Sequence, residues 1–276
     1  MIDAHFHCWQ IARGDYGWLT PALGHLHRDV AVADWYQHAH AHGITAGVLV
    51  QAAPTEAETH FLLAQADAHP QVLGVVGWVD LLAPDAAHRI ETLARHPKLK
   101  GLRPMLQDIE DPDWILQPAL RPALQAITHH GLVFDALIKP VHLPRVRELI
   151  ARHPQLRVVI DHGAKPSPQM PAATWEAGLH AIARESDPAH VACKFSGLWT
   201  ELPAGTDSSA LTPWGEVLLK VWGADRLIWG SDWPVLELAA DYPRWHAWSL
   251  AFLRQHCTPA QCARVLEGNA RAMYRL

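Results

Sequence analysis

The sequence predicts a single (β/α)8 barrel, in which eight parallel strands form an inner sheet and helices cover its outside. Eight short runs of apolar and β-branched residues recur along the chain, and most precede a segment of helical periodicity. No Ser/Gly-rich linker divides the sequence, and 276 residues suit one such barrel. We therefore expect one domain over residues 1–276.

The expected strands are short, and polar or turn-forming residues bound them. They span residues 2–7, 45–51, 72–80, 99–105, 132–138, 157–163, 191–197 and 227–233. Apolar residues at helical spacing predict helices such as Thr55 to His69, Ala86 to His96, Leu143 to His153 and Trp214 to Trp222. Strands that alternate with helices indicate repeated βαβ units, and therefore a parallel sheet.

The least regular segments each follow an expected strand. They are Trp9 to Arg28, Asp108 to Pro118, Gly163 to Trp175 and Leu198 to Pro213. Loops in this position surround the mouth of a (β/α)8 barrel, where such enzymes keep their chemistry. We expect these four segments to form the substrate shell and lid.

Composition favours a small-molecule substrate. The formal net charge is −5 and the Lys and Arg residues are scattered, so nucleic acid and anionic membranes are disfavoured as partners. The chain opens on a strand-like segment without a secretory signal, and its four cysteines have no zinc-site spacing. We expect a cytoplasmic protein with reduced thiols, as a monomer or a homo-oligomer.

Two histidines one residue apart close the first expected strand. Side chains at positions i and i+2 of a strand share a face, so His5 and His7 are expected to converge, with Ala4 on the other face. If this strand lines the barrel, the imidazoles meet at its mouth. A pair of histidines held in this way predicts an enzyme site.

Two later strand ends add a histidine and a carboxylate. Asp161 and His162 are neighbours, so a regular strand would send only one of them into the barrel. We assign His162 to the site and expect Asp161 to pack outward or to cap the next helix. Asp232 follows the last strand, where an N-cap role is the alternative. His5, His7, His162 and Asp232 would suit one divalent metal, zinc or manganese.

Four motifs carry a resemblance to a known family. They are His5-x-His7, Asp161-His162-Gly163-Ala164-Lys165-Pro166, Cys193-Lys194-Phe195-Ser196-Gly197-Leu198 and Gly230-Ser231-Asp232-Trp233-Pro234-Val235. Together they resemble the sugar-lactonase branch of the amidohydrolase superfamily, which includes L-fuconolactonase, L-rhamnonolactonase and 2-pyrone-4,6-dicarboxylate lactonase. The resemblance implies a distorted barrel that opens the ring ester of a lactone. The further metal ligands of binuclear members are missing, so one metal ion and metal-free catalysis both stay open.

A catalytic assignment follows from these residues. Asp232 is the candidate general base for an attacking water, while His5, His7 and His162 bind a metal or polarise the carbonyl. Lys194 is a further catalytic candidate, because its apolar neighbours in the strand direct it into the barrel. We interpret Asp135 as a partner that neutralises a cation there. Gly-x-Ser-x-Gly is absent, so no serine nucleophile is indicated.

Substrate-binding candidates lie near the expected mouth. They are Arg103, Lys165, Trp9, Trp18 and Trp199, the tryptophans offering flat surfaces for a sugar ring. Pro104 stands where the L-fuconolactonase pattern has a histidine, so the sugar is not assigned. Two other functions use the same residues: a metal-dependent decarboxylase of an unsaturated or aromatic acid, and a non-catalytic barrel that binds a carbohydrate or metal.

Overall fold

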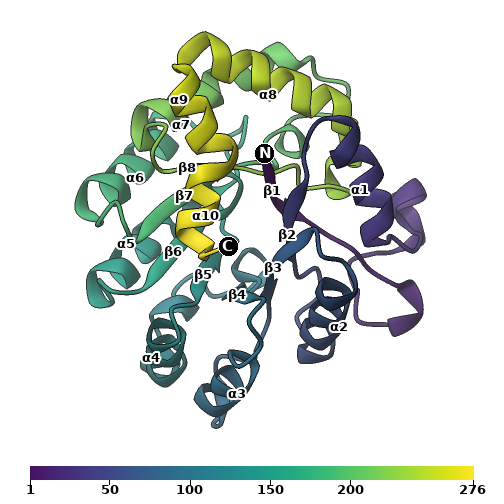
Figure 1. The fold of residues 1–276 in the computed structure, drawn as a ribbon. Helices are drawn as coiled ribbons and strands as arrows, with labels where there is room; N and C mark the ends of the chain where they lie inside the picture. Colours follow the sequence, from purple (N-terminus) through teal and green to yellow (C-terminus); the bar gives the residue numbers. More distant parts are fainter.

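The computed structural model describes residues 1–276 and shows the expected barrel of parallel strands surrounded by helices (Figure 1). The sheet has the order β1-β2-β3-β4-β5-β6-β7-β8, so each strand pairs with the next one along the chain. The strands are β1 Ile2–Phe6, β2 Ala46–Val50, β3 Val72–Gly77, β4 Leu99–Leu102, β5 Val133–Ala136, β6 Arg157–Ile160, β7 Val191–Phe195 and β8 Leu227–Trp229. All eight fall inside the predicted runs, which confirms the fold class.

Helices follow most of the strands and form the outer layer. They are α1 Val32–Ala41, α2 Glu56–Ala68, α3 Ala86–Leu93, α4 Arg121–His129, α5 Leu143–Arg152, α6 Ala172–Glu185, α7 Thr212–Trp222, α8 Tyr242–His256, α9 Pro259–Ala263 and α10 Asn269–Tyr274. The predicted helix starts are close because local signals set them. Thr55, for example, accepts a hydrogen bond from the backbone N–H of Glu58 as the N-cap of α2.

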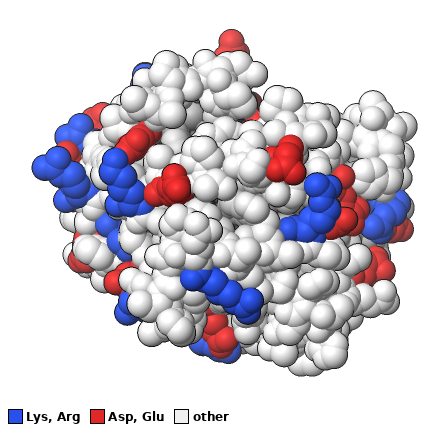
Figure 2. Space-filling view, turned by 90° about the horizontal axis from the view of Figure 1, so that it is seen from above, with Lys and Arg blue, Asp and Glu red and all other residues white.

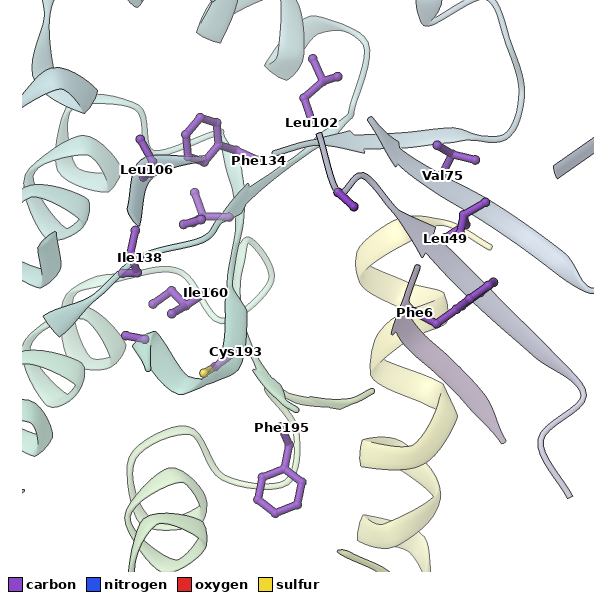
Figure 3. Packing of buried hydrophobic residues seen from close by; sticks show 14 of the residues in the cluster. Phe6, Leu49, Val75, Leu102, Leu106, Phe134, Ile138, Ile160, Cys193 and Phe195 are labelled. Carbon is purple, nitrogen blue, oxygen red and sulfur yellow. The ribbon is translucent and has the colours of Figure 1, made fainter. Parts of the chain in front are cut away.

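Two apolar layers hold the barrel together. The outward faces of the strands pack under the helices, and Figure 3 shows Phe6, Leu49 and Val75 of this layer on successive strands. A smaller cluster lies inside the barrel and includes Val48, Val76, Val133, Val159, Ala192 and Ile228. Alternation along each strand therefore separates the two layers, since successive side chains point to opposite faces.

Residues that follow β8 close the barrel against β1. The backbone N–H of Asp232 donates to the carbonyl of His5 at 2.8 Å, and that of His7 donates to the carbonyl of Trp233 at 2.8 Å. Phe6 and Trp233 form a parallel bridge at the same place. The closure brings Asp232 beside both histidines of the first strand.

An extra residue in β1 changes the predicted facing of Ala4. Asp3 pairs with Gly47 and Phe6 with Leu49, so three steps along β1 match two steps along β2. This is a β-bulge, which places consecutive residues on the same side. Ala4 belongs to the cluster inside the barrel, where His5 also lies, so the expectation that Ala4 takes the opposite face was wrong.

The surface carries charges of both signs. Figure 2 shows one face, where Lys and Arg side chains lie among Asp and Glu side chains and are separated by uncharged surface. None of the helices has the length and apolar character that crossing a membrane requires. The features that distinguish the molecule lie at the mouth of the barrel.

Candidate active site

Three imidazoles surround one oxygen of Asp232. Its Oδ1 atom lies 3.3 Å from Nε2 of His7, 3.5 Å from Nε2 of His5 and 3.7 Å from Nε2 of His162. The His5 ring centroid is 5.0 Å from that of His7 and 4.5 Å from that of His162. The structure therefore brings together the four residues predicted as a metal or catalytic group.

Hydrogen bonds behind two of the rings fix their orientation. Nδ1 of His7 lies 2.8 Å from the carbonyl oxygen of Val50, and Nδ1 of His162 lies 2.9 Å from Oγ of Ser196. The Val50 carbonyl only accepts, so Nδ1 of His7 donates to it. Both rings thus turn Nε2 toward Asp232.

The structure places Asp161 inside the barrel, which corrects the predicted outward position. Val159 belongs to the inner cluster, and regular alternation puts Asp161 on the same side. Its Oδ1 lies 3.0 Å from Nζ of Lys194 and its Oδ2 lies 3.3 Å from an Nη of Arg103. The carboxylate is fully buried and is paired with two cations.

His162 also reaches the site, because the chain leaves the strand conformation after β6. Its φ is 53°, and Gly163, Ala164 and Lys165 continue in the left-handed region with φ of 60°, 61° and 51°. Non-glycine residues rarely adopt this conformation. The left-handed turn breaks the alternation, so adjacent Asp161 and His162 can both face the centre of the barrel.

Lys194 lies behind His5 in the barrel interior. Its Nζ is 2.6 Å from Oδ2 of Asp135 and 3.0 Å from Nδ1 of His5. The side chain is fully buried and does not line the cleft described below. The expected role of Asp135 as a charge partner is confirmed by this contact, while Lys194 contacts His5 and Asp161 from behind the cleft.

The site holds its charges in the forms that metal binding and base catalysis require. Burial lowers the pKa of His162 to about 4 and holds the pKa of His5 well below its ordinary value, Lys194 adding to the latter shift. Burial alone would raise the pKa of Asp232, but His162 and the other two imidazoles together lower it. At neutral pH, His5 and His162 are uncharged and Asp232 is ionised.

A cleft of about 240 Å³ opens over this group. Its wall includes three of the predicted substrate-binding residues, namely Trp18, Arg103 and Lys165. The full lining is His7, Trp18, Ala52, Arg103, Met105, Gln107, Asp108, Leu137, His162, Lys165, Asp232 and Val235. The cleft is therefore built from loops after several strands, as a barrel mouth should be.

Two predicted tryptophans lie outside the cleft. Trp9 is fully buried and its indole N–H donates to the carbonyl of Arg28 at 2.7 Å. Trp199 is also buried, and its indole N–H donates to the carbonyl of Thr206 at 3.3 Å. Both fill the core beneath mouth loops, because a large aromatic ring buries more apolar surface there than on the cleft wall.

Sequence reasoning missed Glu58, which supports the cleft from below. Its carboxylate accepts from the backbone N–H groups of Ala52 and Ala53, at 3.0 Å and 2.7 Å. Ala52 in turn accepts from the indole N–H of Trp18 at 2.7 Å through its carbonyl. The signal available was the motif Thr55-x-x-Glu58, which reads as an ordinary capping box.

The donor set fits one divalent cation. Ligand atoms at 2.0–2.1 Å from a tetrahedral ion are roughly 3.3 Å apart, and the distances from Asp232 Oδ1 to the three Nε2 atoms span 3.3–3.7 Å. Two groups of three residues lie close enough to hold a cation: His5, His7 and Asp232 form the first, and His5, Asp161 and His162 form the second. In the second group the carboxylate of Asp161 is already paired with Lys194 at 3.0 Å and with Arg103 at 3.3 Å, which disfavours a second cation.

Comparisons with known proteins agree with this geometry. Residues 2–276 match the amidohydrolase family model. The chain is 43% identical to the L-fucono-1,5-lactonase of Burkholderia ambifaria, and the match covers 100% of this chain and 95% of that protein. It is 34% identical to the L-fucono-1,5-lactonase of Burkholderia multivorans, and that match covers 87% of this chain and 84% of that protein. A crystal structure of an amidohydrolase from Burkholderia multivorans with bound zinc superposes with a TM-score of 0.93, at 32% identity over 100% and 99% of the two chains. The chain therefore belongs to the amidohydrolase family.

Proposed function

We propose that the protein hydrolyses the ring ester of a sugar-acid lactone and that L-fucono-1,5-lactone is the first substrate to test. The observation that carries the proposal is the ionised Asp232 among three imidazoles, two of which line the cleft with it. A carboxylate held in this way can accept the proton of an attacking water. The 43% identical relative from Burkholderia ambifaria, which is an L-fucono-1,5-lactonase, supports the choice of substrate.

The charge of the cleft favours a neutral, polyhydroxylated lactone over a dicarboxylate. Arg103 is paired with Asp161, and Nζ of Lys165 lies 3.0 Å from an oxygen of Glu201. Asp108 and Asp232 add two carboxylates to the wall. With its cations already neutralised, this wall offers hydrogen bonds for hydroxyl groups and no net positive charge for an anionic substrate.

The reaction begins when Asp232 takes a proton from water as the water oxygen attacks the lactone carbonyl. Arg103, which lines the cleft, stabilises the negative charge that develops on the carbonyl oxygen. When the tetrahedral intermediate collapses, the ring C–O bond breaks and Asp232 returns the proton to the leaving alkoxide. The carboxylic acid formed then ionises and releases a proton.

We propose that His5, His7, His162 and Asp232 hold one zinc or manganese ion. When bound, such an ion supplies a Lewis acid for the carbonyl and lowers the pKa of a coordinated water. Neutral imidazoles and an ionised carboxylate are the protonation states that metal binding requires. The zinc-containing crystal structure of the 32% identical relative supports this assignment.

A pH-indicator assay tests the proposed activity directly, because each turnover releases one proton. Purified protein is supplied with L-fucono-1,5-lactone, other aldonolactones, a pyrone dicarboxylate and aromatic acids, with and without a chelator. Proton release with aldonolactones supports the proposal. CO2 release from an aromatic acid would instead identify a decarboxylase, and binding without turnover of any compound would identify a non-catalytic barrel.

A further inference from the structure

We propose that Tyr274, in the last turn of α10, is a positioning residue of the active site. Its hydroxyl donates to the carboxylate of Asp135, which in turn binds Lys194. This inference rests on the proposed lactone hydrolysis, and it gives the C-terminal helix α10 a part in positioning the active-site residues. Figure 1 shows α10 and the C-terminus near the middle of the ring of strands. The helix thus lies where it can reach the barrel interior.

A continuous series of buried contacts runs from Tyr274 to the imidazole cluster. The Tyr274 hydroxyl donates to Asp135, with distances of 3.0 Å to Oδ1 and 2.8 Å to Oδ2. Oδ2 of Asp135 lies 2.6 Å from Nζ of Lys194, which lies 3.0 Å from both Nδ1 of His5 and Oδ1 of Asp161. All five side chains are buried, so water does not screen these interactions.

The hydroxyl is the only partner that Oδ1 of Asp135 has. Asp135 is fully buried and its two side-chain partners are Lys194 and Tyr274. A buried carboxylate that loses a hydrogen-bond donor is destabilised, since no solvent replaces the donor. Without the hydroxyl, we expect Asp135 to rotate and Lys194 to move toward Asp161, away from Nδ1 of His5.

Packing alone does not require a hydroxyl at this position. Tyr274 belongs to the apolar cluster that also contains Val133, Val159 and Ile228, and a phenylalanine ring would pack into this cluster equally well. The ring also lies below the Lys194 ammonium, 5.5 Å from ring centroid to Nζ. The hydroxyl of Tyr274 is thus the part of the side chain that contacts the charged group, through its hydrogen bonds to Asp135.

Contacts with the strand ends keep α10 in place. The side-chain amide of Asn269 donates to the carbonyls of Ala224 and Leu227 at 2.8 Å and 2.7 Å. Arg157, at the start of β6, donates to the carbonyl of Met273 at 2.6 Å. These bonds attach the helix to the barrel at two points and so hold Tyr274 beside Asp135.

A double-mutant cycle tests the proposal on the full chain. Tyr274→Phe removes one oxygen, Asp135→Asn removes the charge at nearly constant volume, and Met273→Leu is the control in the same helix. We expect Tyr274→Phe to lower kcat about tenfold with KM within about twofold of the unmodified enzyme, and Met273→Leu to leave both constants unchanged. The double variant should lose no more activity than Asp135→Asn alone, because Tyr274 acts through Asp135.

Three outcomes would overturn the proposal: an unchanged kcat in Tyr274→Phe, losses that multiply in the double variant, or a Tyr274→Phe protein that does not fold. Circular dichroism and Tm are measured on every variant, and if Asp135→Asn does not fold, the split between kcat and KM in Tyr274→Phe decides. Absence of lactone turnover in the unmodified protein would count against the proposed function instead, so the two failures are distinguishable.

Discussion

Asp232 Oδ1 and His7 Nε2 lie 3.3 Å apart, although 225 residues separate them along the chain. The closure of the barrel between β8 and β1 creates this contact, because the residues after β8 hydrogen-bond to the end of the first strand. The two ends of the sheet thus meet at the base of the cleft. The candidate site consequently exists only in the closed barrel.

Asp232→Asn should abolish turnover while leaving the fold intact. Asparagine keeps the size of the side chain but cannot take a proton from water, and general bases contribute on the order of 10²–10⁴-fold to rates. We expect kcat on L-fucono-1,5-lactone to fall by about 10³-fold, measured with the pH-indicator assay. Asp225→Asn, at an exposed ion pair with Arg264, is the control and should retain full activity. A near-normal kcat in Asp232→Asn would contradict the general-base role.

One zinc ion per chain should bind, and its binding should depend on His162. The carboxylate of Asp161, the acidic member of the second possible group, is already paired with Lys194 and Arg103, which opposes a second cation. Metal analysis after dialysis gives the stoichiometry, and competition with a chromogenic chelator gives the Kd. His162→Ala should weaken binding by about 10-fold or more, whereas His180→Ala, on the partly exposed face of α6, should not. Two ions per chain, or full affinity in His162→Ala, would contradict this assignment.

The stability of the metal-free protein should fall as the pH drops from about 6.5 to about 4. Burial lowers the pKa of His162 to about 4, against an ordinary value of 6.5, so within this window the unfolded chain binds a proton that the folded protein excludes. Above pH 6.5 both states are neutral and the effect vanishes. The loss amounts to on the order of 3 kcal/mol for this one group.

Urea denaturation at intervals from pH 4 to pH 8 measures this loss of unfolding free energy. His162→Asn has no titrating ring, so its free energy of unfolding should vary less with pH over the acid part of the range. His180→Asn serves as the control for replacing a histidine outside the site. Parallel curves for the His162→Asn variant and the unmodified protein would show that His162 is not the group responsible.

Glu58→Gln should raise KM more than it lowers kcat. The amide leaves one of the two N–H groups of Ala52 and Ala53 facing another donor, so the loop that carries Trp18 shifts at the cleft wall. An unsatisfied buried donor costs about 1–3 kcal/mol, so Tm should also fall. Glu56→Gln is the control, because Glu56 lies two residues earlier in α2 and is paired with Arg89 at the surface. An unchanged KM in Glu58→Gln would show that the Trp18 wall does not depend on this carboxylate.

Lys165→Met should weaken substrate binding without changing the chemical step. Lys165 lines the cleft and is partly exposed at its rim, where Glu201 neutralises it. A polar contact of this kind contributes about 1 kcal/mol, so KM should rise about fivefold at unchanged kcat. Steady-state kinetics measures both constants, with Lys220→Met at the exposed pair with Glu176 as control. A large fall in kcat would instead give Lys165 a part in the reaction.

The sequence by itself determined the strand order, the barrel and the four central residues of the site. Local patterning was sufficient for the strands and the barrel, since apolar runs and helical periodicity are properties of neighbouring residues. The pair His5 and His7 could be recognised because two residues of one strand share a face. His162 could be recognised because it follows an apolar strand, whereas for Asp232 an N-cap role stayed open until the resemblance to the sugar-lactonase branch decided it.

Only the tertiary structure determined whether the remaining side chains point into the barrel or away from it. The bulge in β1 puts Ala4 and His5 on one side, and the left-handed turn at His162 lets Asp161 enter the barrel as well. Backbone irregularities of this kind depend on pairing with distant strands, which local periodicity does not record. Trp9 and Trp199 show the same limit, because burial beneath a loop depends on where the loop folds.

The contact of Tyr274 with Asp135 is the feature least predictable from the sequence. The two residues are 139 positions apart, and nothing in the residues around Tyr274 indicates that its helix reaches the barrel interior. A sequence pattern identifies which residues are apolar or ionisable, and so predicts elements and strand ends. Which buried charge is paired with which donor is determined by the packed structure, because every buried polar group must find its partner there.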